Sequence, residues 1–231
     1  MGERIPPGGD RSRRLTPTRV ASWVHPGVRK VAGTIDERQR QWASHNTRQA
    51  SGDGPLWVAL GDSTVLGVGA SSFENTAAAL VHRRLREHTG QPWRLVNLGR
   101  YGVRLSAVAR EQLPRLQHWG PPALVTVAAG SNDVAWSMGT TALLEDFLLL
   151  LDAIPTGTVV GTLPPGWWGR GLRVNDWLRA AAEQRGLRVA EVGVLPQLRR
   201  MVAVDGFHPN DRGYRFIADG VLHALGVPAE R

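Results

Sequence analysis

Four short segments of the chain carry residue types that together could perform acyl transfer by a serine. In chain order they read Gly61-Asp62-Ser63-Thr64, Asn97-Leu98-Gly99-Arg100-Tyr101-Gly102, Gly130-Ser131-Asn132-Asp133 and Asp205-Gly206-Phe207-His208-Pro209. Each of the first three follows an apolar run, which would place Ser63 at the end of a buried strand. Gly-Asp-Ser alone is expected by chance in about one chain of this composition in twenty, so the other segments decide its meaning.

Acyl transfer by serine requires a general base, a carboxylate that orients the base, and hydrogen-bond donors for the tetrahedral oxyanion. His208 is the candidate base, and Asp205, three residues earlier, can reach its Nδ1 atom. The candidate oxyanion donors are the backbone N–H groups of Ser63 and Gly102 and the side-chain amide of Asn132. The four segments therefore supply every group that the reaction needs.

These segments resemble the SGNH, or GDSL, hydrolase family, which is named for its Ser, Gly, Asn and His. The resemblance runs from about Leu56 to about Leu225. It implies Ser63 as nucleophile, Gly102 and Asn132 as oxyanion donors, and Asp205 and His208 as the other members of the triad. Thr64 stands where the family has leucine, a departure that touches no catalytic atom. Another serine hydrolase class is disfavoured, because residues 61–65 lack the second glycine of a G-x-S-x-G elbow and no HGGG segment is present.

Three other aspartates near these segments are interpreted as structural. Asp211 also lies three residues from His208, but it suits the first turn of the last helix, and Asp205 matches the family segment. Asp62 and Asp133 are expected to accept hydrogen bonds from loop backbone beside the site.

The chain after residue 55 alternates strands and helices, which predicts an α/β fold with a parallel sheet covered on both faces. The expected strands are about Leu56–Leu60, Trp93–Asn97, Ala123–Ala128, Thr158–Thr162 and Leu187–Val192. The expected helices are Glu74 to Glu87, Leu105 to His118 with an interruption at Pro114, Thr140 to Ala153, Val174 to Gln184 and Asp211 to Ala224. The resemblance implies a three-layer αβα flavodoxin-like sandwich with a five-stranded sheet of order 2-1-3-4-5. In such a sheet all the candidate residues follow strands at one edge, where the strand order reverses and ligands bind.

Residues 1–54 form a basic extension, distinct from the predicted hydrolase domain at 55–231. The opening stretch lacks apolar periodicity, so it is expected to be disordered. Val28, Val31, Ile35 and Trp42 form a weak apolar stripe at helical spacing, interrupted by Gly33. We expect a helix over Val28 to Gln49 that packs across the catalytic domain. The alternative is a basic amphipathic segment in peripheral contact with an anionic membrane.

The amino-acid composition argues against several classes of function, namely nucleic-acid binding, cysteine chemistry and metal or cofactor chemistry. All but one of the 28 basic residues are Arg and the net charge is +8, which we interpret as coding bias, because no nucleic-acid-binding motif accompanies the charge. The absence of cysteine excludes disulfides, thiolate metal sites and cysteine nucleophiles. The remaining histidines show no metal-ligand spacing and no phosphate-binding glycine fingerprint is present, so neither a metal nor a cofactor is expected.

The sequence shows no apolar run of the ~20 residues that a membrane span needs. Ser12-Arg13-Arg14-Leu15 resembles a twin-arginine motif, but no apolar region follows it. We therefore expect a cytoplasmic protein, with peripheral membrane contact through the basic extension as the alternative.

Trp136, Trp167 and Trp168 follow the third and fourth predicted strands and are candidates for an apolar substrate wall, with simple packing as the alternative. The predicted function is a serine esterase that hydrolyses short-chain acyl esters of small molecules through an acyl-enzyme. A carbohydrate O-deacetylase and a lysophospholipase or thioesterase are alternatives on the same site. An alternative of another class is a non-catalytic module that docks a membrane or a polyanion.

Overall fold

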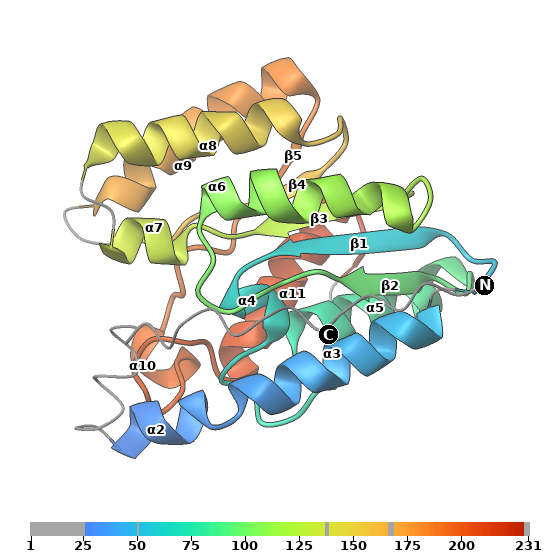
Figure 1. Cartoon of the computed structure of the whole chain (residues 1–231). Coiled ribbons are helices and arrows are strands. Elements are labelled where there is room, and N and C mark those ends of the chain that lie inside the picture. The colour runs from blue at the N-terminus through green and yellow to red at the C-terminus, as the bar shows by residue number, and fades with distance from the viewer. Residues whose placement is uncertain (1–25, 50, 137–138, 166–168, 229–231) are drawn as a thin grey trace, which may run out of the picture.

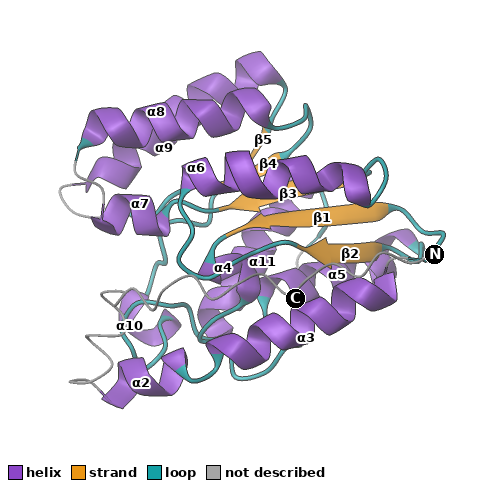
Figure 2. Cartoon of the chain, in the orientation of Figure 1, coloured by secondary structure: helices purple, strands orange, loops and turns teal. Residues whose placement is uncertain are grey.

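The computed structural model describes residues 26–49, 51–136, 139–165 and 169–228. Five strands form one sheet in the order β2-β1-β3-β4-β5, and all four neighbouring pairs are parallel (Figure 1, Figure 2). The strands are β1 (Leu56–Gly61), β2 (Arg94–Asn97), β3 (Leu124–Ala128), β4 (Val159–Gly161) and β5 (Arg188–Ala190). The predicted fold class and strand order are therefore confirmed.

The last two strands are shorter than predicted, and the side chain of Thr162 accounts for the end of their pairing. Its Oγ1 accepts hydrogen bonds from the backbone N–H groups of Val192 and Gly193, each at 2.9 Å. A hydroxyl thus replaces a main-chain carbonyl as the acceptor beyond Ala190, and the two segments separate at the carboxyl edge of the sheet.

Successive side chains of the strands enter two different cores, because a strand has a period of two. Val58 and Leu60 belong to one core, and Trp57 and Ala59 belong to the other. All four side chains are almost completely buried, as expected for a parallel sheet with helices on both faces.

The first core is covered by α8 (Thr140–Ala153), α9 (Arg170–Arg185) and a composite helical segment. The composite segment was predicted as one helix interrupted at Pro114. It consists of α6 (Leu105–Ala107), a π-helical turn η1 (Val108–Gln112) and a 3₁₀-helix η2 (Leu113–His118). Pro114 has no N–H to donate to the preceding turn, so a regular α-helical ladder cannot continue through it.

The second core is covered by α5 (Ala77–Thr89), α11 (Asp211–Leu225) and helices from the N-terminal segment. The side chain of Thr76 accepts a hydrogen bond from Ala79 N–H and caps α5, which therefore begins later than Glu74. Three short helices were not predicted, namely α4 (Ser63–Leu66), α7 (Ser131–Trp136) and α10 (Leu198–Met201).

The N-terminal segment forms two helices where one was predicted, α2 (Pro26–Ala32) and α3 (Ile35–Gln49). They are separated by a turn in which the N–H and hydroxyl of Thr34 both donate to Val31 O. Trp42 of α3 is 2% exposed and packs against Phe73, so α3 lies on the sheet domain (Figure 1). The expected disorder concerns residues that lie outside the described ranges. Within those ranges, no helix combines the length and the apolarity needed to cross a membrane.

Candidate active site

Ser63 is the first residue of α4, directly after β1, and its position is fixed by main-chain constraints. Gly61 has φ +150°, and a Cβ atom there would lie 2.0 Å from the carbonyl oxygen of Ala128 on β3. The side chain of Gln112 donates to Gly61 O at 2.9 Å and accepts from Gly61 N–H at 2.8 Å. Only glycine fits at this junction. The side-chain amide of Gln112, from the helical segment on one face of the sheet, binds the end of the strand that precedes Ser63.

Asp62 forms the start of the same helix. Its Oδ1 accepts a hydrogen bond from Thr64 N–H at 2.8 Å, which makes Asp62 the N-cap of α4. Burial raises the pKa of its carboxyl, although hydrogen bonds from Thr64 and the nearby His208 oppose the shift. This placement agrees with the structural role that was expected for Asp62.

The structure brings Ser63, His208 and Asp205 together in one hydrogen-bonded chain. His208 Nε2 lies 3.1 Å from Ser63 Oγ, and His208 Nδ1 lies 2.6 Å from Asp205 Oδ2. Ser63 and His208 are 3% and 5% exposed. If Nδ1 carries the proton and donates to the carboxylate, the Nε2 lone pair is free to accept the hydroxyl proton of Ser63.

The carboxylate of Asp205 is held by the loop that carries His208. Its Oδ1 accepts backbone N–H groups from Phe207 and His208, each at 3.1 Å. Burial by itself would raise the pKa of Asp205, but the hydrogen bonds and charge of His208 outweigh burial and lower the pKa. Asp205 is therefore ionised, as a carboxylate that orients an imidazole must be.

Asp211, the other aspartate at three residues from His208, has different partners. It begins α11 and accepts hydrogen bonds from Ser71 N–H, Ser71 Oγ and Asn75 Nδ2 at 2.6 to 3.0 Å. Its side chain ties α11 to the loop before α5, and it does not share the environment of the imidazole. The geometry thus agrees with the choice of Asp205.

The candidate oxyanion residues follow β2 and β3, the two neighbours of β1, and so lie at the same edge of the sheet as Ser63. Asn132 Nδ2 donates to Val103 O at 2.9 Å, directly beside Gly102. Gly102 has φ +72°, and nothing lies within 4 Å of the position of a Cβ atom there. An amide nitrogen has two protons, so Asn132 keeps one donor after its bond to Val103.

Asp133 holds the same loop from the adjacent position. Its two carboxylate oxygens lie 3.4 and 3.2 Å from Leu105 N, which donates to them. Burial raises the pKa of Asp133 to about 6, against the effects of the Leu105 hydrogen bond and the charge of Arg104. As expected from the sequence, Asp133 bonds to loop backbone.

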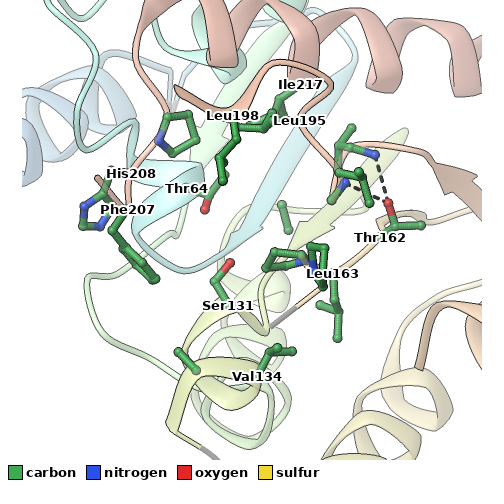
Figure 3. A pocket seen from close by; sticks show the side chains of 18 of the residues that line it. Thr64, Ser131, Val134, Thr162, Leu163, Leu195, Leu198, Phe207, His208 and Ile217 are labelled. Carbon is green, nitrogen blue, oxygen red and sulfur yellow. Dashed lines mark hydrogen bonds between the residues drawn. The ribbon is translucent and has the colours of Figure 1, made fainter. Parts of the chain in front are cut away.

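A cavity of about 600 Å³ opens beside His208, Thr64 and Ser131 (Figure 3). Its walls come mainly from apolar side chains after β4 and β5 and from the His208 loop. Figure 3 labels four of these, Leu163, Leu195, Leu198 and Phe207, together with Val134 of α7 and Ile217 of α11. Among the described residues that line the cavity, His208 is the single ionisable one.

The tryptophan wall expected from the sequence concerns side chains outside the described part of the chain. Trp167 and Trp168 lie outside the described residues, and of Trp136 only the backbone in α7 is described. The apolar walls that are described were not predicted. Their sequence signal is the apolar stretch 192–195, which follows the fifth strand at the carboxyl edge.

Comparisons with known proteins agree with the fold. Residues 59–216 match the model of the GDSL-like Lipase/Acylhydrolase family. The chain is 29% identical over 190 residues to the GDSL-like esterase Rv1075c of Mycobacterium tuberculosis, covering 72% of this chain and 60% of that relative. The chain thus spans less than two thirds of this relative's length.

Two solved structures share the fold at lower identity. A lipase from a goat rumen metagenome superposes with a TM-score of 0.60 at 16% identity, covering 76% of this chain and all of the lipase. The structure of TesA gives the same TM-score at 22% identity, with 74% of this chain and 97% of TesA covered. At such identities the similarity concerns the fold alone.

Proposed function

Because the chain belongs to the GDSL-like lipase/acylhydrolase family, we propose that it is a serine esterase that hydrolyses short-chain acyl esters through an acyl-enzyme. The observation that carries this proposal is the chain of hydrogen bonds from Asp205 to His208 to Ser63, at 2.6 and 3.1 Å. Its place beside an apolar cavity supports the proposal further.

In the proposed acylation step, Ser63 Oγ attacks the carbonyl carbon of the ester and its proton moves to His208 Nε2. Asp205 stabilises the resulting imidazolium through Nδ1–H. The tetrahedral oxyanion accepts hydrogen bonds from Ser63 N–H, Gly102 N–H and the free proton of Asn132 Nδ2. His208 then gives its proton to the leaving alkoxide, and the alcohol departs.

Deacylation repeats these steps with water in place of the serine. His208 removes a proton from a water molecule, which attacks the acyl carbon of the ester on Ser63. Collapse of the second tetrahedral intermediate returns the proton to Ser63 Oγ and releases the carboxylic acid. His208 thus acts as base and acid in turn, and the same donors hold the second oxyanion.

The cavity is the proposed acyl site. Its volume of about 600 Å³ exceeds what an acetyl group needs, so we expect short chains longer than acetyl to be accommodated as well. Burial of each added methylene should raise kcat/KM by about fourfold until the cavity is filled. Apolar walls favour an acyl chain over a sugar ring in this position.

The test is a series of p-nitrophenyl esters from acetate to palmitate, with an acetylated sugar, a lysophospholipid and an acyl thioester measured in parallel. A serine-directed phosphonate identifies the labelled residue by peptide mapping. We expect label on Ser63, hydrolysis of the short esters, and no label on Ser63→Ala. Label on a different serine, or equal turnover by Ser63→Ala, would overturn the mechanism, and preferred turnover of one of the other substrates would reassign the substrate class.

A further inference from the structure

Helix α3 contacts the helix of the proposed nucleophile and the strand that precedes the oxyanion loop, although it precedes the catalytic residues in the chain and lies outside the family match at 59–216. It runs beside β2, at one edge of the sheet, and reaches α4 (Figure 1). Two of its side chains bind main-chain groups there. Trp42 binds the helix of the nucleophile, and Asn46 binds the end of β2.

The side-chain amide of Asn46 forms the two hydrogen bonds with β2 that a neighbouring strand would otherwise form. Asn46 Nδ2 donates to Asn97 O at 2.8 Å, and Asn97 N–H donates to Asn46 Oδ1 at 2.9 Å. Because β2 is the outermost strand, these two main-chain groups face away from β1 and have no ladder partner. One side chain thus satisfies both groups and fixes the end of the strand.

Asn97 in turn binds both parts of the site through its side chain. Its side-chain Nδ2 donates to Val65 O in α4 at 2.8 Å, and its Oδ1 accepts Gly99 N–H at 2.8 Å. Val65 lies two residues after Ser63, and Gly99 lies three residues before Gly102. The spacing between the nucleophile helix and the oxyanion loop therefore depends on where Asn97 is held.

Trp42 binds the next carbonyl at the same end of the nucleophile helix. Its Nε1–H donates to Leu66 O at 2.9 Å, and both residues are buried. Leu66 is the last residue of a helix of only four residues, so its carbonyl has no partner further along the helix. An unpaired buried carbonyl is costly, and the indole N–H removes that cost.

We infer that Asn46 is a positioning residue for the esterase reaction, assisted by Trp42, and that α3 is part of the catalytic apparatus. This inference rests on the proposed function. Asn46 touches no substrate, and acts by holding Asn97 so that Ser63 and Gly102 keep the spacing that the tetrahedral intermediate needs. A displaced oxyanion donor weakens binding of the transition state more than binding of the ester, so kcat should change and KM should not.

The test compares Asn46→Ala with Thr47→Ala in the full chain. Thr47 is an exposed neighbour on α3 whose hydroxyl bonds only to Ala43 O of the same helix among the described contacts, so it is a matched control. We expect Asn46→Ala to lower kcat on a p-nitrophenyl ester by about tenfold, a fraction of the loss from a misplacement of 1 Å, with KM within about twofold. The rate constant of phosphonate labelling should fall by a similar factor, and Thr47→Ala should match wild type.

Two further measurements separate positioning from stability. Activities are compared well below the melting temperature of each variant, and Trp42→Phe, which keeps the ring but removes the N–H, should lower kcat by about threefold. Asn46→Ala with a lowered melting temperature but wild-type kcat and labelling rate would overturn the inference. A wild-type protein that neither hydrolyses esters nor reacts with the phosphonate would instead overturn the proposed function.

Discussion

The regions on the two sides of Ser63 differ in the kind of side chain that they contain. On the β2 side, side-chain amides and an indole bind main-chain groups at 2.8 to 2.9 Å, as with Asn46, Asn97 and Trp42. On the β4 and β5 side, the cavity walls are apolar, and Val194, Leu198 and Phe207 are 51%, 59% and 47% exposed. Hydrogen bonds are directional, whereas apolar burial depends on area alone. The proposed reacting atoms are thus held by directional bonds, whereas the proposed acyl site is lined mainly by apolar side chains.

The largest expected effect lies at the meeting point of the two sides. Ser63→Ala should lower the rate of ester hydrolysis by about 10⁴ to 10⁶, because the proposed acyl-enzyme forms on Ser63 Oγ. The fold should persist, since the change removes one oxygen from a small side chain. Steady-state kinetics and circular dichroism of the purified variant measure both. Loss of activity together with loss of folded structure would leave the serine's role to be judged by phosphonate labelling of the wild type.

Asn132 tests the hydrogen-bonded side directly. Asn132→Ala should lower kcat by about 10² to 10³ with a smaller change in KM, because the amide is proposed to bind the oxyanion better than the ester carbonyl. The variant also loses the bond to Val103 O, so the oxyanion loop is less well held. Stopped-flow or steady-state kinetics give the two constants. An effect confined to KM would assign Asn132 to substrate positioning.

Asp133 provides a pH-dependent test of the same loop. Its folded pKa of about 6, caused first by burial, lies above the unfolded value of about 3.9. A carboxyl with a raised folded pKa stabilises the fold below its unfolded pKa, and this contribution is lost as the pH rises through 6. The loss amounts to about 2 to 3 kcal/mol between pH 4 and pH 7.

Asp133→Asn removes this titration while keeping an acceptor for Leu105 N–H. Relative to the variant, wild type should therefore lose stability from pH 4 to pH 7, as measured by urea unfolding at several pH values. Parallel stability profiles for the two proteins would show that Asp133 titrates normally in the fold.

Substitutions on the apolar side should change kcat/KM for long acyl chains and leave the chemical step on short ones unchanged. Leu198→Ala should lower kcat/KM for a hexanoate ester by about threefold and leave the acetate ester unchanged, because only a longer chain reaches that wall. Val204→Ala is the control, since Val204 is equally exposed at 59% and does not line the cavity. An equal loss on both esters would place Leu198 outside the acyl site.

The smallest kinetic effect is expected from deletion of residues 1–25, which carry the Arg11, Arg13 and Arg14 cluster. As the alternative to coding bias alone, we propose that this basic stretch makes peripheral contact with anionic membranes. Deletion should weaken cosedimentation with phosphatidylglycerol vesicles at low salt and leave kcat/KM on soluble esters unchanged. Equal vesicle binding by both forms would remove the membrane proposal.

The sheet could be predicted from the sequence because most strands contain a short apolar run bounded by turn residues, and α8 begins and ends where predicted. The proximity of Ser63, Asp205 and His208 could be expected because these residues stand in segments with a recognisable order; their roles stay a proposal. Gln112 could not, because nothing near it in the chain indicates that its amide binds Gly61, 51 residues away. The role of Asn46 could not be predicted either, since its partner also lies 51 residues away. Hydrophobic periodicity does not single out an Asn on a polar helix. Such long-range bonds between a side chain and the main chain exist only once the tertiary fold has formed.

The contacts of α3 also determine where a recombinant fragment of this protein should begin. A recombinant fragment drawn from the family boundaries, residues 59–216, would begin inside β1 and end within α11. It would also lack Trp42 and Asn46, so the carbonyl of Leu66 and both main-chain groups of Asn97 would lose their partners. A fragment that starts before Pro26 and extends through Val227 keeps these bonds, and is the shorter form suited to crystallisation and screening.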